Sequence, residues 1–256
     1  MKVTIITVAF NSALTIGDTL RSVAIQSHPD IEHLVIDGQS SDDTLAIVER
    51  EGAHVARVLC EPDSGIYDAM NKGLRMASGD FVGFLNADDI LADSGAIRRH
   101  MAMAESLNAD AVFSDLVYVR AENLRQVIRH WNSGPYSPER LKYGWMPPHP
   151  TFYLRRNRLK EIGEFNTRYR VAADYDFILR SLARANMVVA HAPGVMVKMR
   201  IGGASNKSLK AMMQKSVEDL EVIRRSGVGG VGTLLCKNLR KLPQFMGRRV
   251  APVVVD

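Results

Sequence analysis

Two adjacent acids, Asp88 and Asp89, come at the end of an apolar run, GDFVGFLNADDIL at residues 79–91. Hard cations such as Mg²⁺ and Mn²⁺ prefer oxygen ligands, and they commonly keep water and substrate phosphates in their remaining positions. One or two carboxylates at a strand end would therefore suit a divalent cation that arrives with a nucleoside diphosphate. The same pair also fits a solvated loop, and the spacing alone does not decide between these interpretations.

Two other clusters could bind parts of a nucleotide or a sugar. Asp37 ends the run LVID and could accept hydrogen bonds from a base or a ribose, or it could support the helix that begins nearby. The polar stretch EPDSGIYDAMNKG at 61–73 offers Asn71 for sugar hydroxyls and Lys72 for phosphate charge. Its alternative is a capped turn that leads into a helix, with Lys72 in water.

A second pair of acids flanks Tyr175, just before an apolar helical pattern. Asp174 or Asp176 could be a general base that removes a proton from an attacking hydroxyl. Alternatively, Asp174 caps the helix. His149, in the loop PPHPT, could contact an acceptor or could have a structural role.

These residues need a scaffold that gathers them. Strand-like runs at 3–10, 34–36, 55–60 and 79–91 alternate with helical patterns at 15–26, 41–51 and 67–77. This alternation predicts an α/β fold, with a mostly parallel central sheet flanked by helices. Ligands of open sheets bind at the carboxyl ends of the strands. The same edge should therefore carry Asn11, Asp37, the 61–72 loop and Asp88.

The pattern changes beyond residue 93. Further elements are expected as a helix at 93–106, strand-like runs within 110–130, a helix near 155–162, a helix through 177–185, two strands within 188–200 and a helix at 206–226. These elements would form a second part of the same chain, followed by a C-terminal extension.

Charge is distributed unevenly along the 256 residues, which carry a formal net charge of +5. Residues 224–256 hold seven Lys or Arg and one acid, a surplus of +6 that leaves −1 for residues 1–223. A nearly neutral body without interleaved aromatic and basic residues argues against nucleic acid as a partner.

Composition and cysteine usage suit a cytoplasmic protein. The first residues, where VTIITVAF follows Met1 and Lys2 without a charged region or cleavage site, argue against a secretory leader, and no apolar stretch approaches the roughly 20 residues of a spanning helix. Cys60 and Cys236 offer neither a metal-site spacing nor a disulfide framework.

The basic tail has an apolar stripe at helical spacing, formed by Leu235, Leu239, Leu242 and Met246. Such a segment can lie on an anionic bilayer, here as a peripheral contact on the cytoplasmic face of the inner membrane. The alternative is a terminal helix that packs on the main domain with its basic residues in water.

The order of four motifs, TVAFNS, VIDGQSSDDT, EPDSGIYDAMNKGLRMASGDFVGFLNADD and AADYDFILR, resembles that of the family 2 glycosyltransferases, particularly bacterial enzymes of colanic-acid and exopolysaccharide assembly. The resemblance implies the GT-A fold for residues 1–205, with a nucleotide-sugar-binding half (1–92), an acceptor-binding half (93–205) and a helical basic extension (206–256). It also implies an inverting transfer from a nucleotide-diphosphate sugar to a hydroxyl of a glycan or lipid-linked saccharide in surface polysaccharide biosynthesis, with Mg²⁺ or Mn²⁺.

The resemblance also implies roles for individual residues. Asp37 would contact the nucleotide base, Asp88 would bind the metal as the second acid of a D-x-D element, and Asp174 would be the catalytic base. Arg200 belongs to an R-x-H-x-x-S pattern. The implied donor-binding residues are Thr7, Ala9, Asn11, Asp37, Asn71, Lys72, Asn86 and Ala87, and the acceptor or accessory residues are His149, Asp176 and Arg200.

Four positions depart from the family pattern. Asn86 stands for the first acid of the D-x-D element, Ala173 for the Glu before the base, Gly202 for the histidine of the downstream pattern and Ala13 for an acid after the first strand. These departures bear on metal affinity and ribose contacts.

Two other functions fit the same polar edge. A nucleotidyltransferase would use an acid-bound Mg²⁺, but such enzymes usually carry a Gly- and Arg-rich phosphate loop near the first strand, which TVAFNSALTIGDT lacks. A non-catalytic nucleotide-sugar-binding protein would bind a donor without releasing a nucleoside diphosphate.

Overall fold

The computed structural model of the protein describes residues 1–183, 186–201 and 209–240. The first part runs through β1 (Val3–Ala9), α1 (Ile16–Ala24), β2 (Ile31–Asp37), α2 (Thr44–Glu51), β3 (Val55–Cys60), α3 (Ile66–Met76) and β4 (Phe81–Phe84). The chain continues through β5 (Ile90–Leu91), α4 (Ala96–Ser106), β6 (Ala111–Arg120), β7 (Asn123–Trp131), α5 (Pro138–Lys142), β8 (Tyr153–Arg155), α6 (Leu159–Ile162), α7 (Ala173–Leu182), β9 (Val189–Arg200), α8 (Leu209–Arg225) and α9 (Val231–Leu239). Two short 3₁₀ turns, η1 (His149–Thr151) and η2 (Arg156–Arg158), flank β8.

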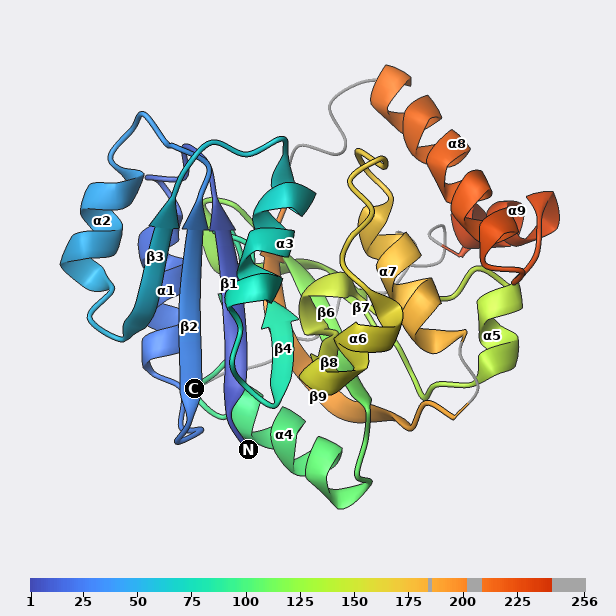
Figure 1. Ribbon diagram of the computed structural model, residues 1–256, viewed down its shortest axis with the longest axis horizontal. Coiled ribbons are helices and arrows are strands. Elements are labelled where there is room, and N and C mark those ends of the chain that lie inside the picture. Colours follow the sequence, from blue (N-terminus) through green and yellow to red (C-terminus); the bar gives the residue numbers. More distant parts are fainter. Residues whose placement is uncertain (184–185, 202–208, 241–256) are drawn as a thin grey trace.

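The described strands form one sheet in the order β3-β2-β1-β4-β8-β6-β9-β5, with β7 paired to β6. The strands β3, β2, β1 and β4 are parallel, which confirms the expected alternation of strand and helix. The sheet becomes mixed beyond β4, because β8 runs antiparallel to both β4 and β6. Figure 1 shows the arrowheads of β1, β2 and β3 on the same side of the molecule.

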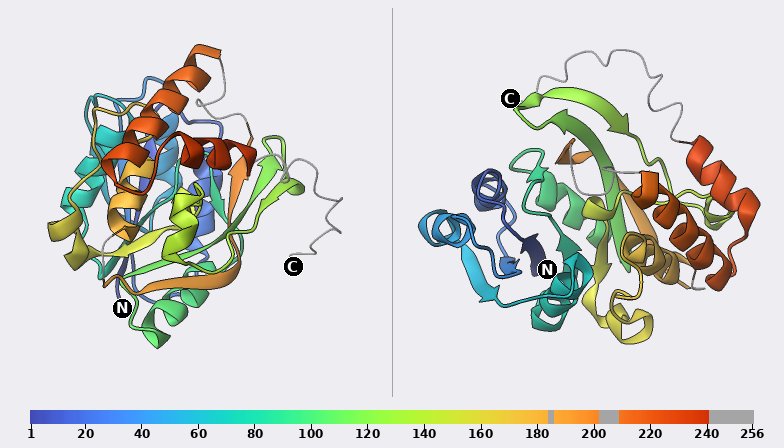
Figure 2. Two further views of the ribbon diagram at one scale, coloured as in Figure 1. Left: turned by 90° about the vertical axis from the view of Figure 1, so that its right-hand side faces the viewer. Right: turned by 90° about the horizontal axis from the view of Figure 1, so that it is seen from above.

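Helices cover both faces of the parallel strands (Figure 2). Successive side chains of a strand point to opposite faces, so Leu34 packs with Met70 of α3, whereas its neighbour Val35 packs with Leu20 of α1. The runs of β1 and β2 are therefore buried on both faces, whereas β3, at the edge of the sheet, is largely exposed.

The apolar run at 79–91 is divided between two strands, although one was expected. After β4, Leu85 and Ala87 still donate backbone hydrogen bonds to β1, at 3.0 Å to Ile6 O and 3.3 Å to Val8 O. A turn then closes from Asp89 N to Asn86 O at 3.0 Å, and β5 leaves to pair with β9. Residues 85–89, here called the Asp88 loop, therefore sit between two strands of the sheet.

Two other expectations beyond residue 150 are corrected. Val189–Arg200 is one continuous strand, β9, where two strands were expected. The three-residue strand β8 was not expected at all, yet it joins the two parts of the sheet, since Leu154 is paired with both Val82 of β4 and Ala111 of β6.

The C-terminal helices pack on the body of the protein, α8 against α7 and α9 against α8 (Figure 1). The alternative of a packed terminal helix with its basic residues in water is correct in part: α9 packs on α8, but Lys237 is buried, whereas Leu235 and Leu239 are exposed. Leu242, Met246 and the basic residues after Arg240 lie outside the described residues. Within the described ranges, no helix has both the length and the apolar character needed to cross a membrane.

Candidate active site

Aligned strand ends form the edge at which a ligand was expected. Ala9 is paired with Asp37, and Asp37 is paired with Cys60, so the last residues of β1, β2 and β3 lie side by side. The Asp37 carboxylate is fully buried and accepts hydrogen bonds from Ser40 N at 2.8 Å and Ser40 Oγ at 2.6 Å. Asp37 is therefore fixed by the loop that follows it.

Asn11 joins the loops after β1 and β2. Its φ of 49° places it in the left-handed region, where Asn is among the more tolerant residues. Its side-chain oxygen accepts a hydrogen bond from Ser41 N at 2.9 Å, and its own N–H donates to Ser40 Oγ at 2.8 Å. Phe10, directly before it, is 62% exposed. We did not single out Phe10 from the sequence; a large aromatic residue immediately after a buried strand was the available signal.

The paired acids of the Asp88 loop have different environments. Asp89 is fully buried, and its Oδ1 accepts a hydrogen bond from Arg200 N at 3.3 Å. Burial and the charge of Asp88 raise the pKa of Asp89 well above its usual value. Asp88 is half-buried; burial also raises its pKa, against the opposing effects of its own backbone N–H and of Arg200. Only Asp88 is therefore placed to meet a ligand.

Several buried polar atoms around this loop lack a partner among the described residues, namely Asn86 Oδ1, Asp89 Oδ2 and Arg200 Nε. Such atoms are uncommon in native proteins and call for a specific explanation, such as an ion or a water molecule. No group of three or more His, Cys, Asp or Glu side chains in the described residues could enclose a metal ion. The loop fits a cation that receives most of its ligands from water and substrate.

Arg200, at the end of β9, holds the Asp88 loop in place. Its guanidinium donates to Asp88 O at 2.7 Å and to the Asp18 carboxylate of α1. Arg200 is buried, and its hydrogen bond to this loop goes to the backbone oxygen of Asp88. Ser205 and Gly202, the other positions of its expected pattern, lie outside the described residues.

Asp174 lies in the first turn of α7. Its Oδ1 accepts hydrogen bonds from Tyr175 N at 2.8 Å and from Tyr67 Oη at 3.4 Å. Tyr67 belongs to the first turn of α3, which follows the carboxyl end of β3, so this contact joins the two parts of the chain. Burial and the Asp174 charge raise the pKa of Tyr67, which keeps its hydroxyl a donor. Tyr67 was missed, although it stands inside the motif GIYDAMNKG.

His149 connects the sheet edge with the start of α7. Its ring stacks on Phe84 of β4, with centroids 5.5 Å apart, and meets the edge of Phe165 at 5.8 Å. Burial lowers the pKa of His149, although the charge of Asp174 opposes this change. Both ring nitrogens are buried without a partner among the described residues. A neutral imidazole here has one free donor and one free acceptor.

Four expected site residues are directed elsewhere. Thr7 is buried with its Oγ1 2.9 Å from His33 Nε2, away from the edge. Both groups of the Asn71 amide bind the backbone of Phe165, at 2.9 and 2.8 Å. Lys72 closes the 61–68 loop through Pro62 O at 2.6 Å.

The fourth of these residues, Asp176, faces along its own helix. It forms a 2.8 Å ion pair with Arg180, one turn later in α7. Asp174 is therefore the member of the acid pair that lies beside Tyr67 and His149.

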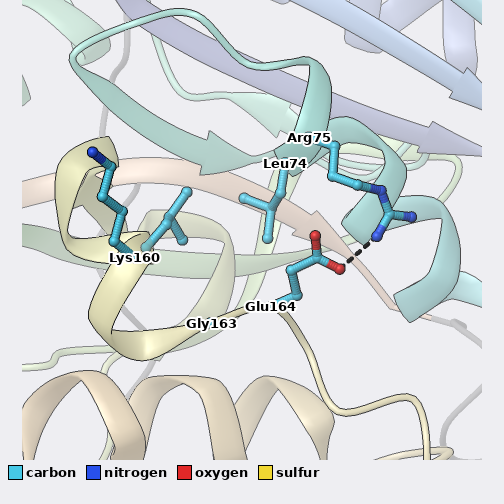
Figure 3. A pocket seen from close by; sticks show the side chains of 6 residues that line it. Leu74, Arg75, Lys160, Gly163 and Glu164 are labelled. Carbon is cyan, nitrogen blue, oxygen red and sulfur yellow. Dashed lines mark hydrogen bonds and ion pairs between the residues drawn. The ribbon is translucent and has the colours of Figure 1, made fainter.

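A separate hollow of about 250 Å³ lies between α3 and α6 (Figure 3). It is lined by Leu74, Arg75, Leu159, Lys160, Gly163 and Glu164. Arg75 and Glu164 form an ion pair of 2.5 Å across it. The hollow shares no residue with the strand-end site.

Residues 4–171 match the family described as "Glycosyl transferase family 2". The chain is 33% identical over 207 residues to a "PGL/p-HBAD biosynthesis glycosyltransferase" of Mycobacterium bovis, covering 79% of this chain and 78% of that one. It is also 40% identical over 92 residues to the "Putative teichuronic acid biosynthesis glycosyltransferase TuaG" of Bacillus subtilis, covering 34% of this chain and 36% of that one.

Solved structures show the same fold. Staphylococcus aureus TarS 1-349, crystallised in complex with UDP-GlcNAc, matches with a TM-score of 0.69 and 22% identity, over 89% of this chain and 66% of that one. The mannosyltransferase PcManGT of Pyrobaculum calidifontis, in complex with GDP-Man and Mn²⁺, matches with a TM-score of 0.66 and 19% identity, over 96% and 73%. The expected GT-A fold is confirmed. The chain belongs to glycosyl transferase family 2.

Proposed function

We propose that the protein is an inverting glycosyltransferase of bacterial surface polysaccharide biosynthesis. It moves a sugar from a nucleotide-diphosphate donor to a hydroxyl of a glycan or lipid-linked saccharide. The observation that carries this proposal is the chain of contacts from Asp174 toward the strand ends. Asp174 accepts a hydrogen bond from Tyr67 and acts electrostatically on His149, whose ring stacks on Phe84, the last residue of β4 before the Asp88 loop. The names of the relatives, which include PGL/p-HBAD biosynthesis and teichuronic acid biosynthesis, support the choice of product.

The donor nucleotide is proposed to lie over the ends of β1 and β2. Asp37 and the ordered loop around Asn11 form a fixed polar floor there, and exposed Phe10 offers an aromatic surface on which a base can stack. Ala9 and Ala87, at the same edge, have side chains buried in the apolar cluster with Leu20 and Val35. Thr7, Asn71 and Lys72 are left with supporting roles.

Asp88 is the proposed protein ligand of Mg²⁺ or Mn²⁺, with Asn86 beside it. When bound, the metal neutralises charge on the leaving nucleoside diphosphate. The protein itself holds the Asp88 loop in place through Arg200 and leaves the half-buried Asp88 carboxylate free to face the diphosphate.

Asp174 is the proposed general base. It takes the proton of the acceptor hydroxyl as that oxygen attacks the anomeric carbon from the face opposite the leaving group, and such assistance typically contributes about 10²–10⁴-fold. His149 is proposed to hydrogen-bond a sugar hydroxyl with one of its unpartnered ring nitrogens.

Release of nucleoside diphosphate tests the proposal. A thermal-shift screen of UDP-, GDP- and dTDP-sugars with Mn²⁺ identifies the donor, and the same donor is then assayed for slow hydrolysis without acceptor. We expect the sugars of one nucleotide to raise the melting temperature of the protein, and we expect slow hydrolysis of that donor to release its sugar. Binding without any release, even with glycan acceptors, would identify a non-catalytic binding protein. Release of pyrophosphate from a nucleoside triphosphate supplied with a sugar 1-phosphate would indicate a nucleotidyltransferase.

A peripheral contact with the cytoplasmic face of the inner membrane is the proposed route to a lipid-linked acceptor. Val231, Leu235 and Leu239 lie one helical turn apart on α9 and are 52%, 57% and 59% exposed. Exposed basic residues lie close by: Arg224 and Arg225 at the end of α8, and Arg240 directly after α9. Each basic residue near an anionic bilayer contributes about 1 kcal/mol.

Vesicle co-sedimentation tests the membrane contact in the full chain. Leu235→Ser combined with Leu239→Ser should reduce binding to vesicles that contain phosphatidylglycerol. The matched control is Leu107→Ser, at the end of α4, where the leucine is similarly exposed at 53%. Equal sedimentation of both variants and wild type would remove the membrane proposal.

A further inference from the structure

Helix α8 contacts the backbone directly in front of Asp174. The Glu218 carboxylate accepts three hydrogen bonds from consecutive backbone N–H groups, those of Arg170 at 3.2 Å, Val171 at 2.9 Å and Ala172 at 3.0 Å. Residues 170–172 are called the α7 entry segment below, because α7 begins at Ala173.

Glu218 is held in place for this contact. It is buried, and Gln214, one turn earlier in α8, donates a hydrogen bond of 2.9 Å to its Oε1. Burial alone would raise its pKa, but the hydrogen bonds from Val171, Gln214, Ala172 and Arg170 together lower it. The carboxylate is therefore ionised at neutral pH, and a negative charge beside the N-terminus of a helix is favourable.

The α7 entry segment is fixed from two sides. Glu218 accepts a hydrogen bond from the N–H of Val171, and Tyr67 donates one to its carbonyl oxygen at 2.9 Å. The Tyr67 hydroxyl also lies 3.4 Å from Asp174 Oδ1. A shift of Val171 would therefore move the contact that orients the proposed base.

The neighbouring acid of α8 fixes the same helix from a second point. Asp219 binds Lys237 of α9 at 2.7 Å, and the Lys237 ammonium lies 3.2 Å from the centre of the Tyr175 ring. Tyr175 directly follows Asp174. Two consecutive acids of α8 thus contact residues on both sides of the proposed base, one directly and one through Lys237.

We infer that Glu218 is a positioning residue for Asp174, and that α8 is part of the catalytic centre of this enzyme. The inference rests on the proposed function, because it assumes that Asp174 is the base. Glu218 touches neither donor nor acceptor in this role. It fixes the position of the Asp174 carboxylate, and a misplacement of about 1 Å can reduce a rate about 10²-fold.

Substitutions of Glu218 test the inference by separating turnover from binding. We expect Glu218→Ala to lower kcat for donor hydrolysis about 10–100-fold, with KM for the donor and the affinity for UDP or GDP with Mn²⁺ within about twofold of wild type. The kcat of Glu218→Gln should lie between those of wild type and Glu218→Ala, because its amide keeps one acceptor oxygen. The matched control is Glu221→Ala, one turn later in α8, which removes ion pairs with Arg168 and Arg225. The control should keep wild-type kcat.

A double-mutant cycle distinguishes positioning from general support of the fold. If Glu218 acts through Asp174, Glu218→Ala should have almost no further effect on kcat in an Asp174→Asn background. An equal fold-loss in both backgrounds would overturn the positioning role, and so would wild-type kcat in both Glu218 variants. If Glu218→Ala fails to fold, Glu218→Gln enters the same cycle.

The failure of the inference is distinguishable from that of the proposed function. Full turnover of Asp174→Asn alone would contradict the proposed base. Loss of turnover in Asp174→Asn together with normal kcat in the Glu218 variants would leave the proposed function intact and remove only the role of α8.

Discussion

The Asp88 loop and the start of α7 each carry one acid proposed to act on the donor or acceptor, but they differ in how the groups that hold each acid in place are hydrogen-bonded, although the His149 ring nitrogens near Asp174 also lack partners in the described residues. Around the Asp88 loop, Asn86 Oδ1, Asp89 Oδ2 and Arg200 Nε are buried without partners in the described part of the chain. In the α7 entry segment, all three N–H groups are hydrogen-bonded to one carboxylate, that of Glu218.

The difference indicates two ways of preparing a site. Buried groups that lack partners gain hydrogen bonds or charge neutralisation when a ligand arrives, so the Asp88 loop suits binding. A fully bonded backbone has little left to gain from a ligand, but it fixes the geometry of whatever it carries, which suits a proton-transferring group. Variants of the Asp88 loop should therefore change mainly affinity, and variants around α7 mainly turnover.

The largest effect is expected for Asp174→Asn. Loss of a general base should reduce kcat about 10²–10⁴-fold, whereas donor affinity measured by titration calorimetry should stay within about twofold. Asp176→Asn is the matched comparison in the same helical turn, since its carboxylate faces Arg180. We expect it to retain turnover. An equal loss of donor affinity in Asp174→Asn would reassign Asp174 to binding.

Asp88→Asn should change the affinity for the nucleotide, and the direction of that change should depend on whether the metal is present. With Mn²⁺ present, UDP or GDP should bind at least about tenfold more weakly, a loss of about 1.4 kcal/mol. Without metal, the same variant should bind the nucleotide no worse than wild type, because a negative charge near the diphosphate has been removed. Asp89→Asn serves as the control within the pair. Identical metal dependence in Asp88→Asn and wild type would refute the metal assignment.

Arg200→Lys should disturb the Asp88 loop without touching its carboxylate. A lysine presents a single ammonium in place of the guanidinium fork, and it should not contact Asp88 O and the Asp18 carboxylate together. We expect donor affinity to fall by about 3–10-fold, about 1 kcal/mol, at unchanged kcat once donor is saturating. A fall in kcat at unchanged affinity would place Arg200 with Glu218 among the positioning residues.

The smallest effect concerns the anchoring of α9. Burial lowers the pKa of Lys237 from 10.5 to about 7, although Asp219 opposes the change. Between these pH values the unfolded chain binds more protons than the folded one, so this residue makes the fold more stable as pH rises.

Lys237→Met should remove that pH dependence. The unfolding free energy of wild type relative to Lys237→Met should rise by about 1–2 kcal/mol between pH 7 and pH 9. Chemical denaturation at both pH values measures it, with Lys142→Met as a control for an exposed lysine near α5. Parallel pH profiles for wild type and Lys237→Met would show that the lysine titrates normally.

The parallel strands and their polar edge could be predicted from the sequence, because both follow from local patterns. Apolar runs that end in Asp37 and Asp88 define strand ends, and parallel strands bring such ends together. For the same reason, the sequence predicts which aspartates lie at this edge. The sequence does not predict which of Asp88 and Asp89 is buried, because that depends on which side chain the turn after Asn86 directs inward.

The parts that were missed depend on contacts between distant segments. Strand β8 has three residues between two 3₁₀ turns, too few for any period to show. Glu218 stands in a polar stretch of α8, which is typical of a solvated helix face. Burial of Lys237 runs against the usual exposure of lysine, and only its pairing with Asp219 makes it tolerable. Asn71 and Lys72 were expected to meet a sugar and a phosphate, but their hydrogen bonds go to the backbone of Phe165 and Pro62.

The contact between Glu218 and the α7 entry segment also concerns the order in which the protein is made. Ribosomes extend a chain from its N-terminus, and domains fold in that order. The strands β1, β2 and β3, which align Asp37, are complete well before α8 emerges from the exit tunnel, whereas the Asp88 loop needs Arg200 of β9, which comes just before α8. A partly synthesised chain therefore lacks both the anchored Asp88 loop and the contact from Glu218, so the proposed sugar transfer should begin only when translation is nearly finished.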